Sequence, residues 1–140
     1  MTDYVLDTSA LLTLRDDEPG ADRVAELLAQ ATRGESRCFG CFITRMELLY
    51  RVWKDEGETE GRLAYEQSAS LPITWLSENE DMLLRAAAIK ARNTISVADA
   101  WIAACTEMLD ATLIHKDPEF GPLPIKQETL PMKPSQGKSG

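Results

Sequence analysis

The chain has 140 residues, of which 44% are hydrophobic, and this is enough for one globular domain with a single core. Its 23 acidic and 15 basic residues give a net charge of -8 at pH 7, which excludes nucleic-acid binding through a broad basic surface. No apolar run approaches the roughly 20 residues that cross a bilayer, and the acidic N-terminus is unlike a signal peptide. We therefore expect a cytoplasmic protein whose contacts with nucleic acid are local.

Strands and helices are predicted in alternation. A short strand at 3–6 precedes a helix that opens at Thr8 and a second helix at 20–32, where apolar residues recur at helical spacing. The later predicted strands are 37–42, 73–76, 112–115 and a short 123–126, and the later helices are 44–54, 58–69, 77–92 and 96–109. This order predicts an α/β fold with a parallel sheet covered on both faces.

No linker or internal repeat divides the chain, so one domain is expected over residues 1–130. Residues 131–140, which contain Pro, Ser, Gln, Gly and Lys, are expected to form a disordered tail.

Three cysteines make an odd count, which argues against a disulfide framework. Cys38 and Cys41 form a C-x-x-C pair that, with Cys105 and His115, would just suffice for one zinc site. The alternative is that these cysteines are small buried hydrophobic residues. We favour the alternative, because the alternation of a strand would point Cys38 and Cys41 to opposite faces.

Four acidic residues fall at the predicted ends of elements. Asp7 ends the first strand, and Asp117 directly follows the fourth. Glu47 and Asp99 lie in the predicted first turns of two helices. Ligands bind beyond the carboxyl ends of the strands in an open parallel sheet. Three of the four acids map to that edge, and Asp99 could reach it from the neighbouring helix start.

Each of these acids also has a local explanation. Asp7 can cap the helix that follows it, and Asp117 with Pro118 can form a plain turn. Glu47 and Asp99 each stand three residues after a hydroxyl residue, as in a capping box. If all four converge, however, each close pair repels by roughly 4 kcal/mol at about 4 Å and an effective dielectric near 20. Since a cap contributes only ~1 kcal/mol, convergence would require a bound cation or protonation.

Carboxylate ligands in a chain with one histidine favour a hard cation, Mg²⁺ or Mn²⁺, over zinc. Such an ion activates water and neutralises a phosphodiester, and it supplies the positive charge that this acidic protein lacks for binding RNA. Arg45 and Lys116 adjoin two of the acids in sequence. They are either contacts for RNA phosphates or ordinary solubilising charges.

Five segments occur in a recognisable order: VLDTSALL, DEPGADRVAELL, ITRMELLYRV, SVADAWIAA and TLIHKDPEF. Together they resemble the PIN-domain ribonucleases, specifically the VapC-type toxins of bacterial and archaeal toxin–antitoxin pairs, over residues 1 to about 126. The resemblance implies a PIN-like three-layer α/β/α sandwich with a central, mostly parallel sheet of about five strands.

The resemblance also implies an endoribonuclease that uses Mg²⁺ or Mn²⁺ to direct water at an RNA phosphodiester. Relatives act on structured RNA such as tRNA, form homodimers and are silenced by a VapB-type antitoxin. The implied catalytic and metal-binding residues are Asp7, Glu47, Asp99 and Asp117, supported by the hydroxyls of Thr8 and Ser9.

His115 departs from the family pattern, which usually has Thr or Ser two residues before the fourth acid. It is a donor beside the site, an RNA phosphate contact or a pH-sensitive group, or else a packed residue at a strand end. The helices over 44–69 are implied to form the flank where the antitoxin and a second subunit dock. Leu49, Tyr50 and Trp53 are either anchors there or part of the core.

Two other classes of protein compete with a nuclease. A phosphoacceptor module also binds Mg²⁺ at strand ends, but the adjacent acidic pair expected after its first strand is absent here. A non-catalytic binding module could keep the fold, although the presence of all four acids speaks against it.

Overall fold

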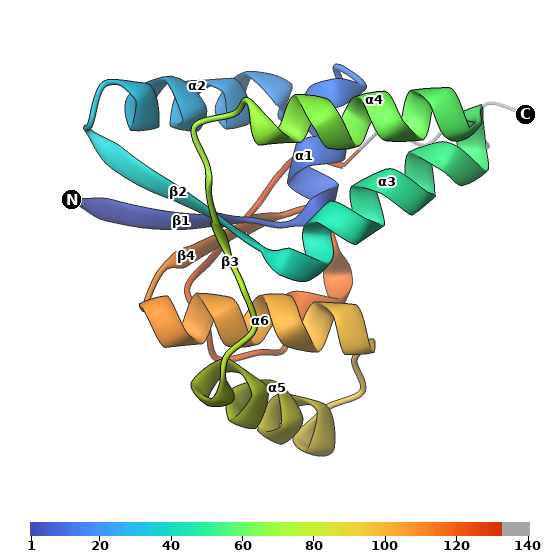
Figure 1. Cartoon of the computed structure of the whole chain (residues 1–140). Coiled ribbons are helices and arrows are strands. Elements are labelled where there is room, and N and C mark those ends of the chain that lie inside the picture. Colours follow the sequence, from blue (N-terminus) through green and yellow to red (C-terminus); the bar gives the residue numbers. More distant parts are fainter. Residues whose placement is uncertain (133–140) are drawn as a thin grey trace, which may run out of the picture.

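Five parallel strands form the central layer of the structure, a computed structural model that describes residues 1–132 (Figure 1). The strands are β1 (Thr2–Leu6), β2 (Ser36–Cys41), β3 (Thr74–Leu76), β4 (Thr112–His115) and β5 (Gln127–Thr129), in the order β3-β2-β1-β4-β5. The predicted α/β fold with a parallel sheet is confirmed. Most of the tail expected at 131–140 lies outside the described residues.

Helices cover both faces of the sheet. They are α1 (Thr8–Arg15), α2 (Ala21–Thr32), α3 (Phe42–Glu56), α4 (Glu58–Ala69), α5 (Glu80–Arg92) and α6 (Val97–Leu109). Figure 1 shows α1, α2 and α4 above the sheet and α5 and α6 beneath it, while α3 leaves the end of β2 and runs beside α4. Gly61 permits that pairing, because a Cβ there would lie 2.7 Å from the carbonyl oxygen of Leu49. None of the helices in the described part of the chain is long and apolar enough to cross a membrane.

Alternate residues of the central strands face the two covering layers. Val5 and Leu113 belong to the hydrophobic cluster that contains the buried side of α6. Leu6 and Ile114, the next residue of each strand, belong to the cluster that contains α1 and α2. This two-residue period buries both faces, which explains why adjacent residues of β1 and β4, Val5–Leu6 and Leu113–Ile114, are all apolar.

The cysteines follow the same alternation. Cys38 lies in the cluster with α2, where its thiol is 3.6 Å from the carbonyl oxygen of Leu27. Cys41 and Cys105 lie in the other cluster, and all three thiols are free and buried. The expected opposite placement of Cys38 and Cys41 is therefore confirmed, and a zinc site built from these cysteines and His115 is excluded.

Several element boundaries differ from the prediction, among them the start of α5, which is Glu80 rather than residue 77. The last strand was expected at 123–126, but β5 is Gln127–Thr129. Pro122 and Pro124 lack the N–H groups that a strand needs, so pairing with β4 begins only after them. Helix α3 begins at Phe42 rather than at Thr44, because the buried Thr44 is inside the helix and Cys41 is its N-cap.

The strand order places a switch point between β1 and β4. The chain builds β2 and β3 on one side of β1, then crosses to add β4 and β5 on the other. Loops leaving the carboxyl ends of the two central strands therefore diverge, and this leaves room for a ligand between them. Asp7 follows β1 directly and Asp117 follows β4 after one residue.

Candidate metal centre

A pocket of about 360 Å³ lies at the switch point, at the carboxyl edge of the sheet. Five acidic residues line it: Asp7, Glu47, Asp99, Asp117 and Glu119. The other lining residues are Thr8, Ser9, Arg51, Ser96, Lys116 and Pro118. The structure thus brings together the four acids singled out in the sequence and adds Glu119 to them.

Asp7 is held by one carboxylate oxygen and leaves the other without a partner. Its Oδ2 accepts a hydrogen bond from the backbone N–H of Ser9 at 3.1 Å and a second from the hydroxyl of Ser9, so Asp7 is indeed the N-cap of α1. The side chain is 3% exposed, and Oδ1 is buried with no hydrogen-bond partner among residues 1–132. A buried anionic oxygen without a donor is costly, and a bound cation would remove that cost.

The environment of Asp7 opposes its ionisation. Burial, above all, raises the pKa of its carboxyl from 3.8 to about 6, and the nearby charges of Glu47 and Asp117 add to this effect. Hydrogen bonds from Ser9 act in the opposite direction. A carboxyl group in this state gains from any positive charge placed beside it.

Glu47 is positioned by the first turn of α1. The hydroxyl of Thr8 lies 2.7 Å from Glu47 Oε1 and 3.1 Å from the hydroxyl of Thr44. A threonine hydroxyl carries one proton, and the carboxylate is the stronger acceptor, so the hydroxyl of Thr8 donates to Glu47. Because α3 begins at Phe42, Glu47 lies in the second turn of this helix and not in the predicted first turn. Thr44 forms no capping box with it.

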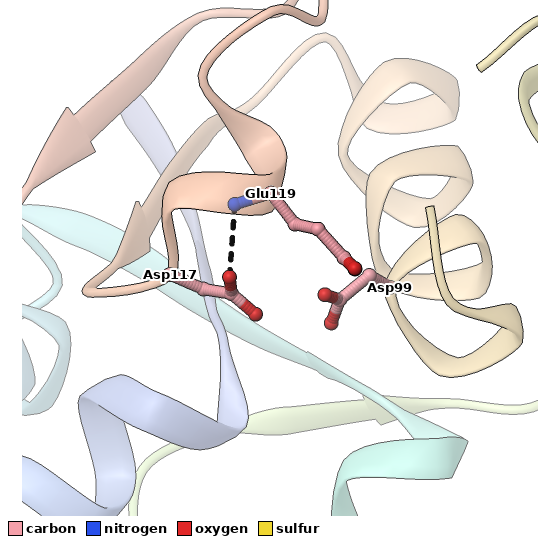
Figure 2. Close-up of side chains that lie close together, drawn as sticks. All are labelled: Asp99, Asp117 and Glu119. Atoms are coloured by element: carbon pink, nitrogen blue, oxygen red, sulfur yellow. Dashed lines mark hydrogen bonds between the residues drawn. The ribbon is translucent and has the colours of Figure 1, made fainter. Parts of the chain in front are cut away.

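Asp99, Asp117 and Glu119 form a tight group whose carboxylate oxygens lie within 4.8 Å of one another. Figure 2 shows the three side chains pointing toward one another from α6 and from the turn after β4. Local hydrogen bonds fix them. Ser96 Oγ accepts from the Asp99 N–H at 3.1 Å, and Asp117 Oδ1 accepts from the Glu119 N–H at 2.9 Å. The N–H of Ser96 donates to Glu119 Oε1 at 3.0 Å, which joins the start of α6 to this turn.

The surroundings of Asp99 favour the protonated form of its carboxyl group. Burial raises the pKa of Asp99 far above its usual range, and hydrogen bonds with Glu119 and Asp117 raise it further. The pKa of Glu119 is lowered, mainly because its carboxylate accepts that hydrogen bond from Asp99. A cation bound by these oxygens would displace the proton, as metal binding to acidic ligands generally does.

The basic candidates from the sequence have different fates. Arg45 does not line the pocket: its guanidinium donates to the hydroxyl of Tyr65 at 3.0 Å and stacks over the rings of Tyr65 and Trp75. The structure therefore does not place Arg45 with the acids, and its contact with an RNA phosphate stays a prediction. Lys116 does line the pocket, with its ammonium 2.9 Å from the carbonyl oxygen of Pro19.

His115 is a packed residue rather than a surface contact. It is 1% exposed, and its Nδ1 accepts the N–H of Asp117 at 3.0 Å. Its Nε2 therefore carries the proton and donates to Gln127 Oε1 at 2.8 Å. The possible RNA contact by His115 is corrected accordingly, and its imidazole instead holds the backbone of Asp117 in place.

Two charged residues of the pocket, Glu119 and Arg51, were not predicted from the sequence. Glu119 stands two positions after Asp117 on a 3₁₀ turn, Pro118–Phe120, that returns it to the same site. Arg51 stands four positions after Glu47 and thus on the same face of α3. The spacing of Arg51 from Glu47 is a signal that could have been used, once a helix through 54 was predicted.

The PIN domain model matches residues 4–124. The chain belongs to the PIN-domain family. A search of curated protein sequences gives no match. Among solved structures, VapBC-1 from nontypeable Haemophilus influenzae is 26% identical, with a TM-score of 0.70, 91% of this chain covered and 98% of that one. VapBC2 from Rickettsia felis, bound to a DNA fragment from its promoter, is 16% identical, with a TM-score of 0.75 and coverages of 93% and 100%.

A third neighbour is VapC20 from Mycobacterium tuberculosis, a toxin that cleaves the sarcin–ricin loop, at 13% identity, a TM-score of 0.69 and coverages of 94% and 99%. The structural neighbours are thus VapC toxins of VapBC toxin–antitoxin systems at low identity, several of them crystallised with VapB or FitA antitoxins. PIN domains are usually metal-dependent nucleases. The group of Asp99, Asp117 and Glu119 fits a PIN metal site, since hard oxygen ligands of this kind bind divalent cations.

Proposed function

We propose that this PIN-domain protein is a Mg²⁺- or Mn²⁺-dependent endoribonuclease that acts as a growth-inhibiting toxin. The observation that carries the proposal is the unpartnered, buried Oδ1 of Asp7 in a pocket lined by four further carboxylates. Without a cation these carboxylates repel one another, and the pKa of Asp99 is raised by its surroundings. A function that uses the cation explains this electrostatic cost.

The residues divide the work according to their contacts. Asp7, Asp99, Asp117 and Glu119 would hold the ion, while Glu47, fixed by the Thr8 hydroxyl, would accept a proton from the attacking water. When bound, Mg²⁺ or Mn²⁺ supplies an activated water and neutralises charge that develops on the phosphodiester. Ser9 fixes the orientation of Asp7 and also accepts the backbone N–H of Lys116 at 2.9 Å, so it ties the loops after β1 and β4 together.

The toxin role, in the cytoplasm, rests on likeness to VapC neighbours, as does neutralisation by a VapB-type antitoxin. Structured RNA is the proposed substrate class. The flank formed by α3 and α4 supports a protein partner and a homodimer, because Tyr50 and Trp53 remain 46% and 43% exposed there. Leu49 beside them is half-buried and contributes less surface.

Incubation of the purified protein with total RNA tests the nuclease activity. We expect endonucleolytic fragments with Mg²⁺ or Mn²⁺ and none with EDTA. Asp99→Asn should abolish the fragments, because it removes a ligand charge while keeping the side-chain shape. Asp110→Asn is the matched control, since Asp110 lies just beyond the other end of the same helix, 91% exposed.

Cleavage that survives EDTA or Asp99→Asn would overturn the metal-dependent mechanism. A toxin also requires that expression of the wild-type chain, but not of Asp99→Asn, arrests growth. Growth that continues normally while RNA is cleaved in vitro would separate the nuclease from the toxin role.

A further inference from the structure

Two adjoining hollows meet at the side chain of Arg51. One is the acidic pocket, and the other, of about 390 Å³, extends from it between α1 and α3. Ser9, Arg51 and Lys116 line both hollows. Together the hollows form a groove that begins at the carboxylates and runs along the molecular surface.

Arg51 differs from the other cations of this groove in having no partner. Arg15 binds Glu56 at 2.7 Å and Asp16 at 2.9 Å. Lys116 lies 3.5 Å from Glu18 and donates to the carbonyl oxygen of Pro19. Within residues 1–132, by contrast, no ion pair or hydrogen bond engages the guanidinium of Arg51, which is exposed to solvent.

This freedom is unexpected from its neighbours along the helix. Glu47 precedes Arg51 by four residues and Asp55 follows it by four, and these spacings favour ion pairs on a helix. Both acids line the groove, yet neither pairs with Arg51. The guanidinium thus remains available to an anion that enters the groove.

We propose that Arg51 binds a backbone phosphate of the RNA next to the one that is cleaved, and so sets the path of the strand across the site. The inference rests on the proposed nuclease function. The cation held by the carboxylates compensates only the phosphate at the site, while neighbouring phosphates meet a protein of net charge -8. The planar fork of a guanidinium matches two phosphate oxygens. Arg51 lies where the groove continues from the acidic pocket into the second hollow.

Binding and cleavage measurements separate this inference from the proposed function. In the Asp7→Asn background, affinity for a fluorescein-labelled, mixed-sequence single-stranded RNA is measured against salt concentration, with Arg51→Gln, Arg51→Lys and Lys54→Gln added in turn. Lys54→Gln is the matched control, because this substitution removes the same charge from the same helix, while Lys54 lines neither hollow. These comparisons need no turnover.

We expect Arg51→Gln to weaken binding on the order of tenfold, the equivalent of one good charged contact. The slope of log affinity against log salt should become shallower by about 0.7, the value for one phosphate of a single strand. Arg51→Lys should recover the slope but only part of the affinity, since it keeps the charge and loses the fork. In cleavage by the otherwise unmodified chain, Arg51→Gln should raise KM more than it lowers kcat.

Equal affinities and slopes for Arg51→Gln and Lys54→Gln overturn the inference, as does the absence of measurable RNA binding by their parent. A protein partner's carboxylate is the competing ligand for Arg51, and it would leave RNA binding and KM unchanged in Arg51→Gln. Wild-type protein that binds RNA in this Arg51-dependent manner but never cleaves it would reject the nuclease proposal alone.

Discussion

The two ends of β1 carry acids in opposite situations. Asp3, near its start, receives two hydrogen bonds from the guanidinium of Arg37, at 2.7 and 2.8 Å. Asp7, directly after its end, has hydroxyl and backbone donors on one oxygen and nothing on the other, and its charged neighbours are acids. The same residue type is thus neutralised at one end of a strand and left electrostatically unfavourable at the other.

The contrast extends over the sheet. At the amino-terminal edge and on the outer helices, acids have basic partners, such as Glu35 with Arg33 and Asp81 with Arg85, both at 2.8 Å. At the carboxyl edge, the acids of the pocket face other acids. Since folding alone would favour pairing at both edges, the concentration of acids at one edge supports the proposed binding of a cation there.

The largest expected effect is on catalysis, at Asp7. Asp7→Asn should lower the rate of RNA cleavage by at least about 10²-fold, the scale found when a group that stabilises transition-state charge is removed. Asp3→Asn should leave the rate unchanged, because Asp3 is at the other end of the strand. Single-turnover cleavage of one RNA in Mn²⁺ measures both variants, and similar losses in the two would break the comparison.

The pH dependence of stability gives the next largest effect. Asp7 binds its proton more tightly in the folded protein than in the unfolded chain, since its pKa is raised to about 6. Stability of the metal-free protein should therefore fall as pH rises from 3.8 to about 6, by roughly 3 kcal/mol for this group. Above that range the loss is complete.

Asp7→Asn should remove this contribution. Chemical unfolding in EDTA at pH 4 and pH 7 measures it as a difference: relative to wild type, the variant should gain roughly 2.4 kcal/mol of this total between the two pH values. A constant difference between variant and wild type would mean that Asp7 titrates normally and that its burial is not costly.

Local features of the molecule could be predicted from the sequence more readily than contacts between distant segments. The N-cap roles of Asp7 and Ser96 were predictable, because a cap depends on a few adjacent residues. Strand alternation and the four acids at element ends were predictable from the same kind of local pattern. Asp7 and Asp117 each have both a local capping role and a place in the pocket, whereas Glu47 lies in the pocket without a capping role.

The features that were missed depend on contacts between distant segments. Glu119 joins the site because its carboxylate meets the N–H of Ser96, 23 residues away. Arg45 lies outside the site because its guanidinium stacks over the rings of Tyr65 and Trp75. No periodicity within one element encodes such choices, so a basic residue beside an acid in sequence was a poor guide to its surroundings.

Metal binding should stabilise the folded protein by an amount similar to the loss of stability that the ionisation of Asp7 causes. Mn²⁺ at about 100 times its Kd should stabilise the folded protein by about 2.7 kcal/mol, because only the folded state brings the ligands together. Thermal unfolding during a Mn²⁺ titration measures this as a rise in Tm that EDTA reverses. Asp117→Asn should reduce the rise, and Glu35→Gln, which alters an exposed ion pair, should not. An equal rise in both variants would place the ion elsewhere.

The smallest effect is expected at the paired end of β1. Arg37 is 60% exposed, and exposed ion pairs contribute little because water and salt screen them. Asp3→Asn should therefore lower the free energy of unfolding by no more than about 1 kcal/mol, and the loss should shrink in concentrated salt. Urea unfolding at two salt concentrations measures it. A larger loss that does not depend on salt would mean that the ion pair of Asp3 contributes substantially to the stability of the fold. The two ends of β1 would then no longer differ in the way proposed.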